Sequence, residues 1–383
     1  KQYPNFENVN FYKKIFIKKE FKQFYNKNNK INSIKSNHFQ LQPQQSFLKK
    51  YISINTPYNS VLVFHGTGVG KTCTAINIAE NFKYKLHKSN KRILVILPRS
   101  IRSNFIKELY NITKPDNKQC IGTIYKYTDS YKNASPEKKV YNIRSNIKKY
   151  YQFYGYEQFA NYVIRSTGWN GNISNIKDEV KNFINKKYSN RVIIIDEIHH
   201  LKSTKDSLIK KVPPILESIA KFANNIKFVL MSATPMYDSP KEIIYLLNLM
   251  LLNDNREKIK DSDIFDSNGN ITNKGIDILK NISRGYISYY RGENFSDFPY
   301  KIYAKKSVIP KFKFDIKGNK NNSNLNYLQL FPTYFTNDQY NFYNSFINTN
   351  FLVNKYDSVN KENNFKKNRV MILQQLSNIV FPI

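Results

Sequence analysis

The sequence has little of several features that would define its class. Its 383 residues include two cysteines, Cys73 and Cys120, which are too few for a disulfide scaffold or a zinc cluster built on cysteine and fit a reducing compartment. No apolar run approaches the ~18 residues of a membrane span, so no membrane partner is expected. The first 14 residues are polar and basic, which predicts no signal peptide.

Acidic residues are also scarce. Asp and Glu number 28 against 61 Lys and Arg, which gives a formal net charge of +33. Such an excess predicts attraction to a polyanion, above all nucleic acid. A second explanation is codon drift, because the abundant Lys, Asn, Ile, Tyr and Phe share A/T-rich codons while Gly and Pro number only 12 and 14. Nucleic-acid binding with a salt slope near zero would favour this second explanation.

The length predicts two domains, and hydrophobic residues, at 40%, suffice for a sizeable core. We expect a basic N-terminal segment at 1–40, forming a peripheral arm or a short helical layer. A main lobe is predicted at 41–235, with a largely helical insertion at about 113–190. A helical extension at 236–315 and a linker with the entry to a second lobe at 316–383 complete the expected organisation.

Short apolar runs alternate with helical stretches in the main lobe. Strands are predicted at 61–64, 92–97, 192–195 and 226–231, and helices at 73–82, 101–109 and 241–252. Continuous apolar strands between helices are typical of an α/β fold, in which a parallel sheet is covered by helices on both faces.

The strongest motif is HGTGVGKT at positions 65–72, between a predicted strand and a predicted helix. This context predicts a P-loop, in which small residues let backbone N–H groups converge on phosphates at a helix N-terminus. Lys71 would contact the β- and γ-phosphates, and the Thr72 hydroxyl would coordinate Mg²⁺. The strict pattern has Gly or Ala where His65 stands. The expected nucleotide-binding residues of the loop are Gly66, Thr67, Gly68, Val69, Gly70, Lys71 and Thr72.

A second motif, Asp196-Glu197-Ile198-His199-His200, follows the predicted strand at 192–195. Adjacent carboxylates at the end of a buried strand are unfavourable unless a cation is present, and nucleotide-bound Mg²⁺ is such a cation. We assign Asp196 to the metal and Glu197 to the general base that polarises the attacking water. His199 could couple the nucleotide to the next motif, whereas His200 is better explained as a polar residue at a strand end.

The third motif, Ser232-Ala233-Thr234, follows the last predicted strand. The hydroxyls of Ser232 and Thr234 could bridge to a catalytic carboxylate or histidine. The motif is weak alone and becomes specific in this order after the other two.

These three motifs in this order resemble the first RecA-like lobe of a superfamily 2 helicase or translocase. The resemblance implies that Gln45, in LQPQQ at 41–45, contacts adenine, although a solvated glutamine would explain it as well. It also implies that Arg99, Ser100 and Arg102 contact the nucleic-acid backbone.

Further stretches at 64–75, 237–243, 285–294 and 376–382 are similar to helicase-like ATPases of large cytoplasmic DNA viruses. The group includes the early transcription factor small subunit and nucleoside triphosphate phosphohydrolase I. This resemblance implies ATP and Mg²⁺ as cofactors and a DNA-dependent ATPase that favours duplex DNA over RNA. It also implies action in viral early transcription, with the viral RNA polymerase or a large transcription-factor subunit, in the virion and the host cytoplasm (viral factory).

The family's second lobe carries a Gln-x-x-Gly-Arg-x-x-Arg segment, which this sequence lacks, so most of that lobe is expected to be missing. Arginine fingers contribute ~10³-fold or more to the rate, so the isolated chain should bind ATP weakly and hydrolyse it slowly. Two alternatives stay open: an RNA helicase acting on transcripts, and a non-enzymatic basic scaffold with a vestigial nucleotide site. Intact Lys71, Thr72, Asp196 and Glu197 argue against the scaffold.

Overall fold

The computed structural model describes residues 2–24, 38–169, 171, 176–203, 206–291 and 335–353. The chain divides into two compact units, 1–294 and 295–383. The described part of the second unit contains the helix α14 (Asn337–Val353). All other elements belong to the first unit.

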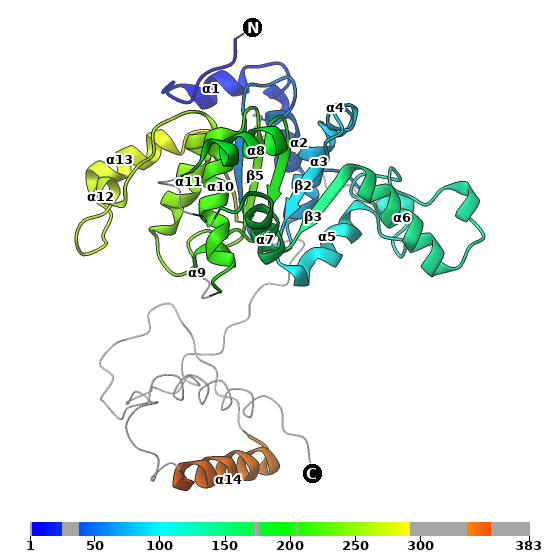
Figure 1. Ribbon diagram of the computed structural model, residues 1–383, viewed down its shortest axis with the longest axis vertical. Coiled ribbons are helices and arrows are strands. Elements are labelled where there is room, and N and C mark those ends of the chain that lie inside the picture. Colours follow the sequence, from blue (N-terminus) through cyan, green and yellow to red (C-terminus); the bar gives the residue numbers. More distant parts are fainter. Residues whose placement is uncertain are drawn as a thin grey trace. The chain divides into compact units, whose positions relative to one another are not determined.

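The centre of the first unit is a six-stranded sheet in which every neighbouring pair of strands is parallel (Figure 1). The strand order is β3-β2-β4-β5-β1-β6. The strands are β1 (Ser60–His65), β2 (Ile93–Ile96), β3 (Tyr151–Tyr154), β4 (Val192–Ile195), β5 (Lys227–Ser232) and β6 (Ile287–Tyr290). The predicted α/β class with a parallel sheet is confirmed, and the sheet is that of a RecA-like lobe.

Helices cover both faces of the sheet. The strand β4 is apolar throughout because its side chains are buried on both of these faces. Val192 and Ile194 point into the core on one face, whereas Ile193 and Ile195 point into the core on the other. The first face is covered by α2 (Pro43–Tyr51), α3 (Lys71–Glu80), α5 (Arg102–Leu109) and α6 (Pro136–Tyr150). The second is covered by α7 (Tyr156–Thr167), α8 (Asp178–Tyr188), α10 (Val212–Phe222) and α11 (Glu242–Asn253) (Figure 1).

Residues 2–24 form a packed helical layer around α1 (Phe11–Phe16) and η1 (Lys22–Phe24). The side chains of Phe11, Ile15 and Phe21 are buried. They join an aromatic cluster whose centre is the stacked pair Tyr51 and Tyr58, with ring centroids 4.4 Å apart. Over residues 2–24 the chain therefore forms a packed helical layer, and the segment boundary at residue 40 stays a prediction.

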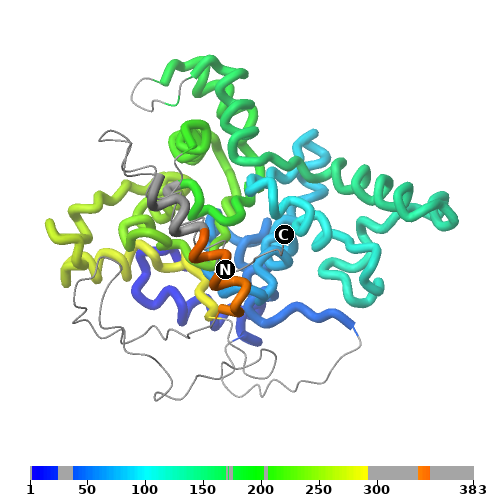
Figure 2. The backbone as a smooth tube through the Cα atoms, turned by 90° about the horizontal axis from the view of Figure 1, so that it is seen from below, coloured from blue at the N-terminus to red at the C-terminus, as the bar shows by residue number. Residues whose placement is uncertain are grey.

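The interval 113–190 contributes to the sheet as well as to its helical cover. It holds η3 (Asp116–Lys118), η4 (Asp129–Tyr131), α6, β3, α7 and α8. The region around α6 projects sideways from the sheet in both views (Figure 2).

The remaining helices of the first unit are short apart from α13. They are α4 (Lys83–Lys88), η2 (Arg99–Ile101), α9 (His200–Ser203), η6 (Ile209–Lys211), α12 (Asp261–Ile264) and α13 (Asn273–Ile282). No helix in the described ranges is both long enough and apolar enough to cross a bilayer. Within the predicted linker and second-lobe entry at 316–383, the structure describes residues 335–353, and the family-like stretch at 376–382 lies outside the described residues.

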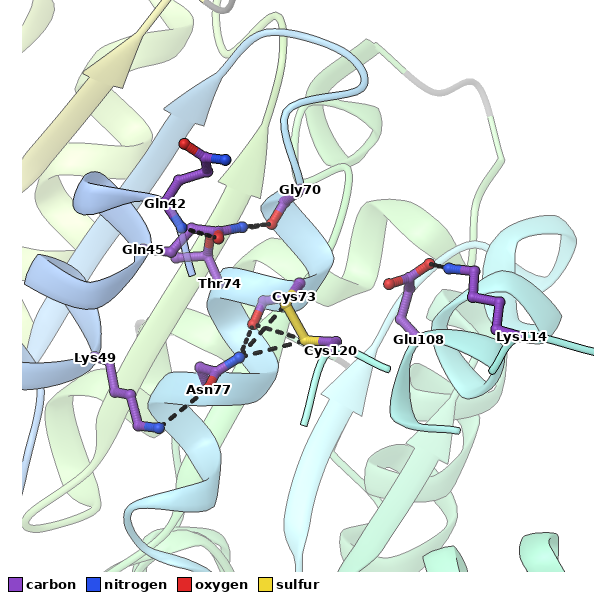
Figure 3. The surroundings of a disulfide bond; sticks show 10 residues. All are labelled: Gln42, Gln45, Lys49, Gly70, Cys73, Thr74, Asn77, Glu108, Lys114 and Cys120. Carbon is purple, nitrogen blue, oxygen red and sulfur yellow. Dashed lines mark hydrogen bonds and ion pairs between the residues drawn. A yellow bond between two sulfur atoms is a disulfide. The ribbon is translucent and has the colours of Figure 1, made fainter. Parts of the chain in front are cut away.

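Cys73 and Cys120 form a disulfide, which joins α3 to the segment after η3 (Figure 3). The amide of Asn77 lies beside both sulfur atoms, 3.4 Å from Cys73 Sγ and 3.3 Å from Cys120 Sγ. The Lys49 ammonium donates to the Asn77 side-chain oxygen at 3.2 Å. This bond differs from the free thiols that are typical of a reducing compartment, because the fold brings together two cysteines with a sequence separation of 47.

Candidate nucleotide site at the carboxyl edge of the sheet

The loop between β1 and α3 has the conformation expected of a phosphate cradle. Gly68 and Gly70 adopt left-handed backbone conformations, with φ of 76° and 79°. A Cβ atom at Gly70 would lie 2.6 Å from the Gln45 side-chain nitrogen, so this position requires glycine. The Lys71 ammonium donates to the Gly66 carbonyl at 2.9 Å, which holds the lysine across its own loop.

Gln45 is built into the same loop from α2. Its side-chain oxygen accepts a hydrogen bond from the Gln42 N–H at 2.9 Å, and its Nε2 donates to the Gly70 carbonyl at 3.1 Å (Figure 3). Only 3% of Gln45 is exposed, so the alternative of a solvated glutamine is wrong. The adenine contact stays a prediction.

Asp196 and Glu197 follow β4 and lie close enough to Lys71 to influence its charge. Burial of Asp196 and the neighbouring Glu197 carboxylate raise the pKa of Asp196 to about 7, while Lys71 acts in the opposite direction. Burial likewise lowers the pKa of Lys71, and both carboxylates oppose that shift. The fold therefore brings the P-loop lysine and the acidic pair to one place.

The oxygen atoms at this place suit Mg²⁺. Thr72 offers a hydroxyl and Asp196 a carboxylate, and Mg²⁺ prefers such hard oxygen ligands together with substrate phosphates. The charged form of the buried Asp196 carboxyl is favoured by the Glu197 N–H, which donates to its Oδ1 at 3.0 Å, and by Lys71, and a bound cation would stabilise it further. Within the described residues no group of three or more His, Cys, Asp or Glu could hold a metal alone.

A chain of polar contacts joins the acidic pair to the Ser-Ala-Thr loop after β5. His199 Nδ1 lies 3.3 Å from Glu197 Oε2 and 2.9 Å from the Ser232 hydroxyl. The Thr234 N–H donates to the same hydroxyl at 3.0 Å. The side chain of Thr234 is exposed, so this residue joins the chain through its backbone only. His200 is also exposed and lies outside the chain of contacts.

Sequence reasoning missed Tyr156, the first residue of α7. Its buried hydroxyl donates to the backbone carbonyls of Asp196 and Glu197, the latter at 3.0 Å. Glu197 has a φ of 51°, a left-handed conformation that is unfavourable for this residue type. Tyr156 thus fastens the turn that presents the candidate base. No local pattern identified it, because it lies 40 residues away in the sequence.

His65 ends β1 directly beneath the loop, and its side chain is fully buried. Its Nε2 lies 2.9 Å from the Ser288 hydroxyl on β6, and its Nδ1 is buried without a partner within the described residues. Burial and the nearby Lys71 charge lower the pKa of His65 to about 4, so the ring is neutral. In the sequence, His65 stood out only because the P-loop pattern has Gly or Ala at this position. The sequence did not predict the contact of His65 with Ser288.

The predicted nucleic-acid residues lie at the same edge of the sheet, after β2. Arg99 and Ser100 line a hollow of about 530 Å³ together with Tyr156 and Glu157. Arg99 is paired with Glu157 at 3.2 Å, although its side chain is 65% exposed. Arg102 lies apart from this hollow, with its guanidinium over the ring of Phe153 at 5.5 Å.

Comparison with known proteins gives this geometry a family. The model of the type III restriction enzyme res subunit matches residues 37–237. The "Putative ATP-dependent RNA helicase R563" of Acanthamoeba polyphaga mimivirus is 32% identical over 320 residues, covering 78% of this chain and 49% of that protein. Nucleoside triphosphatase I of Choristoneura fumiferana entomopoxvirus is 31% identical over 291 residues, covering 73% of this chain and 38% of that protein.

Among solved structures, the Sulfolobus solfataricus SWI2/SNF2 ATPase core in complex with dsDNA aligns with a TM-score of 0.40 and 13% identity, a similarity too weak to bear on function. It covers 88% of this chain and 58% of that chain. The chain spans half or less of the length of the curated relatives given above. Since the family model covers more than half of the sequence, the chain belongs to the type III restriction enzyme res-subunit family and is related to superfamily 2 helicases and nucleoside triphosphatases of large DNA viruses.

Proposed function

We propose that this chain is the nucleotide-binding lobe of an ATP-dependent nucleic-acid translocase or helicase. The observation that carries the proposal is the electrostatic influence of the acidic pair on Lys71, together with the contacts that run from Glu197 through His199 to Ser232. Such a set links a phosphate site to a second loop at the same edge of the sheet, as a motor requires.

The P-loop and the acidic pair have separate roles in the proposed hydrolysis. The backbone N–H groups of 66–72 and the Lys71 ammonium bind the phosphates, and Lys71 exchanges the Gly66 carbonyl for phosphate oxygen when ATP enters. Thr72 and Asp196 would hold Mg²⁺, which supplies positive charge to the phosphates when bound. Glu197 accepts the proton of the attacking water as general base, in the orientation that Tyr156 maintains.

His199 couples the site to the rest of the lobe. Because its Nδ1 lies near both Glu197 and Ser232, a shift of the Glu197 carboxylate on phosphate binding changes which partner the ring holds. The Ser232 loop then moves with it, since the Thr234 N–H depends on the same hydroxyl.

Duplex DNA is the nucleic acid that we assign to this motor. The net charge of +33 supports a polyanionic partner, and the hollow at Arg99 and Ser100 lies beside the candidate catalytic turn through Tyr156. The motif resemblance described for the sequence is the basis on which we propose a role in viral early transcription with the viral RNA polymerase or a large transcription-factor subunit; the entomopoxvirus relative supports nucleoside triphosphate hydrolysis. Virion and host cytoplasm, at the viral factory, are the corresponding location.

RNA is the second candidate, supported by the name of the mimivirus relative. The test measures ATP turnover by the whole protein with duplex DNA, single-stranded DNA and duplex RNA at matched phosphate concentrations. Duplex DNA should stimulate turnover most strongly. Strongest stimulation by A-form RNA would transfer the proposal to an RNA helicase, and no stimulation by any of the three would contradict a motor function.

A further inference from the structure

A second hollow lies at the opposite edge of the sheet, where the parallel strands begin. Its volume is about 500 Å³, within the range of small-ligand sites. Its wall includes Asn59 just before β1, Lys91 just before β2, Arg191 just before β4 and Lys227 at the start of β5. The candidate nucleotide site uses the carboxyl ends of the same strands, so the two places do not share residues.

The charge of this hollow is one-sided. Lys85, Lys91, Arg191 and Lys227 line it, and none of the described residues in its wall is acidic. Arg191 is only 5% exposed and Lys227 only 9%. Two cations that are more than nine-tenths buried therefore face the same space as two more accessible ones.

Neutral groups hold the buried cations in place. Arg191 Nε donates to the Arg92 carbonyl at 2.7 Å, and one of its terminal nitrogens donates to the Gln152 side-chain oxygen. Lys227 Nζ donates to the Tyr58 carbonyl at 3.0 Å and to the Asn59 side-chain oxygen at 2.8 Å. These neutral acceptors position the two cations but carry no negative charge. A buried positive charge without a negative partner among its hydrogen-bond acceptors is unfavourable.

Asp254 is the carboxylate that acts on Lys227, but it lies outside the wall and accepts hydrogen bonds from Asn59 and Tyr286. Burial lowers the pKa of Lys227 to about 8, with Lys85 adding to the shift, and burial and Arg191 lower the pKa of Lys91. Like charges thus act on each other in two pairs, Lys85 with Lys227 and Lys91 with Arg191, and an anion in the hollow would relieve this repulsion.

We propose that this hollow binds a phosphate-bearing ligand of mononucleotide size, with its phosphate facing Arg191 and Lys227 and with Lys85 and Lys91 at the entrance. The ring of Phe82 and the side chain of Leu86 provide an apolar wall for the rest of the ligand. The amides of Asn190 and Asn225, which are hydrogen-bonded to each other at 2.8 Å, border the same space. The site is independent of ATP hydrolysis at the opposite edge.

The test titrates pyrophosphate and AMP into the chain by calorimetry, in a Lys71→Ala background that disables the P-loop. We expect binding to persist there and to weaken about tenfold or more when Lys85→Gln and Lys91→Gln are added, since each removes a charge-assisted contact. Lys88→Gln, which removes an exposed charge from the same helix outside the hollow, is the matched control and should leave the affinity unchanged.

Arg191→Gln should abolish binding if thermal unfolding shows that the variant folds; if it does not fold, the Lys85 and Lys91 pair decides alone. A third titration uses a 12-nucleotide single-stranded DNA with a 5′-phosphate. It distinguishes a free small phosphate compound from the phosphate at the end of a nucleic acid as the source of the bound group. The proposal is overturned if neither pyrophosphate nor AMP binds, if Lys88→Gln weakens binding as much as the pair does, or if only the oligonucleotide binds.

Discussion

The two edges of the sheet differ in how their functional residues are encoded. At the carboxyl edge, β1, β4 and β5 are each followed by functional residues that lie close together in the sequence, as at 66–72 and 196–199. At the amino edge, each of several strands contributes one cation, such as Arg191 or Lys227, separated from the next by tens of residues. A motif search finds the first arrangement and passes over the second, because only the fold brings isolated residues together.

At the carboxyl edge of the sheet, the largest effect of a substitution on ATP turnover is expected at Glu197. Glu197→Gln should reduce ATP turnover by the whole protein about 10²–10⁴-fold, because the amide cannot accept the proton of the attacking water. ATP binding should persist. Glu179→Gln, on the exposed surface of α8, is the control for loss of one carboxylate. Turnover equal to that control would remove Glu197 from the role of base.

Reduction of the Cys73–Cys120 disulfide is the next largest effect. The bond closes a loop with a sequence separation of 47, which corresponds to about 4 kcal/mol of unfolding free energy in the chain-entropy model. Dithiothreitol should therefore lower the unfolding midpoint in denaturant titrations of the chain. A Cys73→Ser and Cys120→Ser variant should not respond to dithiothreitol. An unchanged wild-type midpoint would show that the bond contributes no stability.

His65 should make stability depend on pH in the acidic range. Its pKa is about 4 in the folded chain against an ordinary value of 6.5, so the unfolded chain binds the proton more tightly. Stability is complete above pH 6.5 and decreases as the pH falls from 6.5 to 4, by at most about 3 kcal/mol. Unfolding of the wild type and of His65→Gln across this range isolates the effect. Parallel pH profiles would contradict a buried neutral histidine.

The smallest effect is expected at Tyr156. Tyr156→Phe removes the hydroxyl that fastens the Glu197 turn, a loss of about 1 kcal/mol, and should lower kcat about fivefold. KM for ATP should stay within twofold, since the phosphate contacts are intact. Tyr141→Phe, on the exposed side of α6, is the control. An equal loss in both variants, or a change confined to KM, would assign Tyr156 a structural role only.

Which strands could be predicted depends on where they lie in the sheet. The four predicted from apolar runs, β1, β2, β4 and β5, are the inner strands and are buried on both faces. The two for which no strand bounds were predicted, β3 and β6, are the edge strands, where partial exposure admits residues such as Gln152 and Ser288. A continuous apolar run is a sign of burial on both faces, which an edge strand does not have.

The candidate site divides in the same way. The P-loop, the acidic pair and Ser232 are contiguous motifs, and the fold brings them together as expected. Tyr156 and Ser288 reach the site from distant segments as single residues, and no sequence motif assigns either of them to the site. The ion pair of Arg99 with Glu157 could not be predicted either, because it depends on the register of β3 beside β2.

The most direct measurement compares one lysine from each edge. ATP turnover by the whole protein, at saturating ATP and duplex DNA, should fall more than about 100-fold in Lys71→Ala, because the phosphates lose their charged partner. Lys91→Gln should stay within twofold of the wild type. Wild-type turnover in Lys71→Ala would contradict the assignment of catalysis to the carboxyl edge of the sheet.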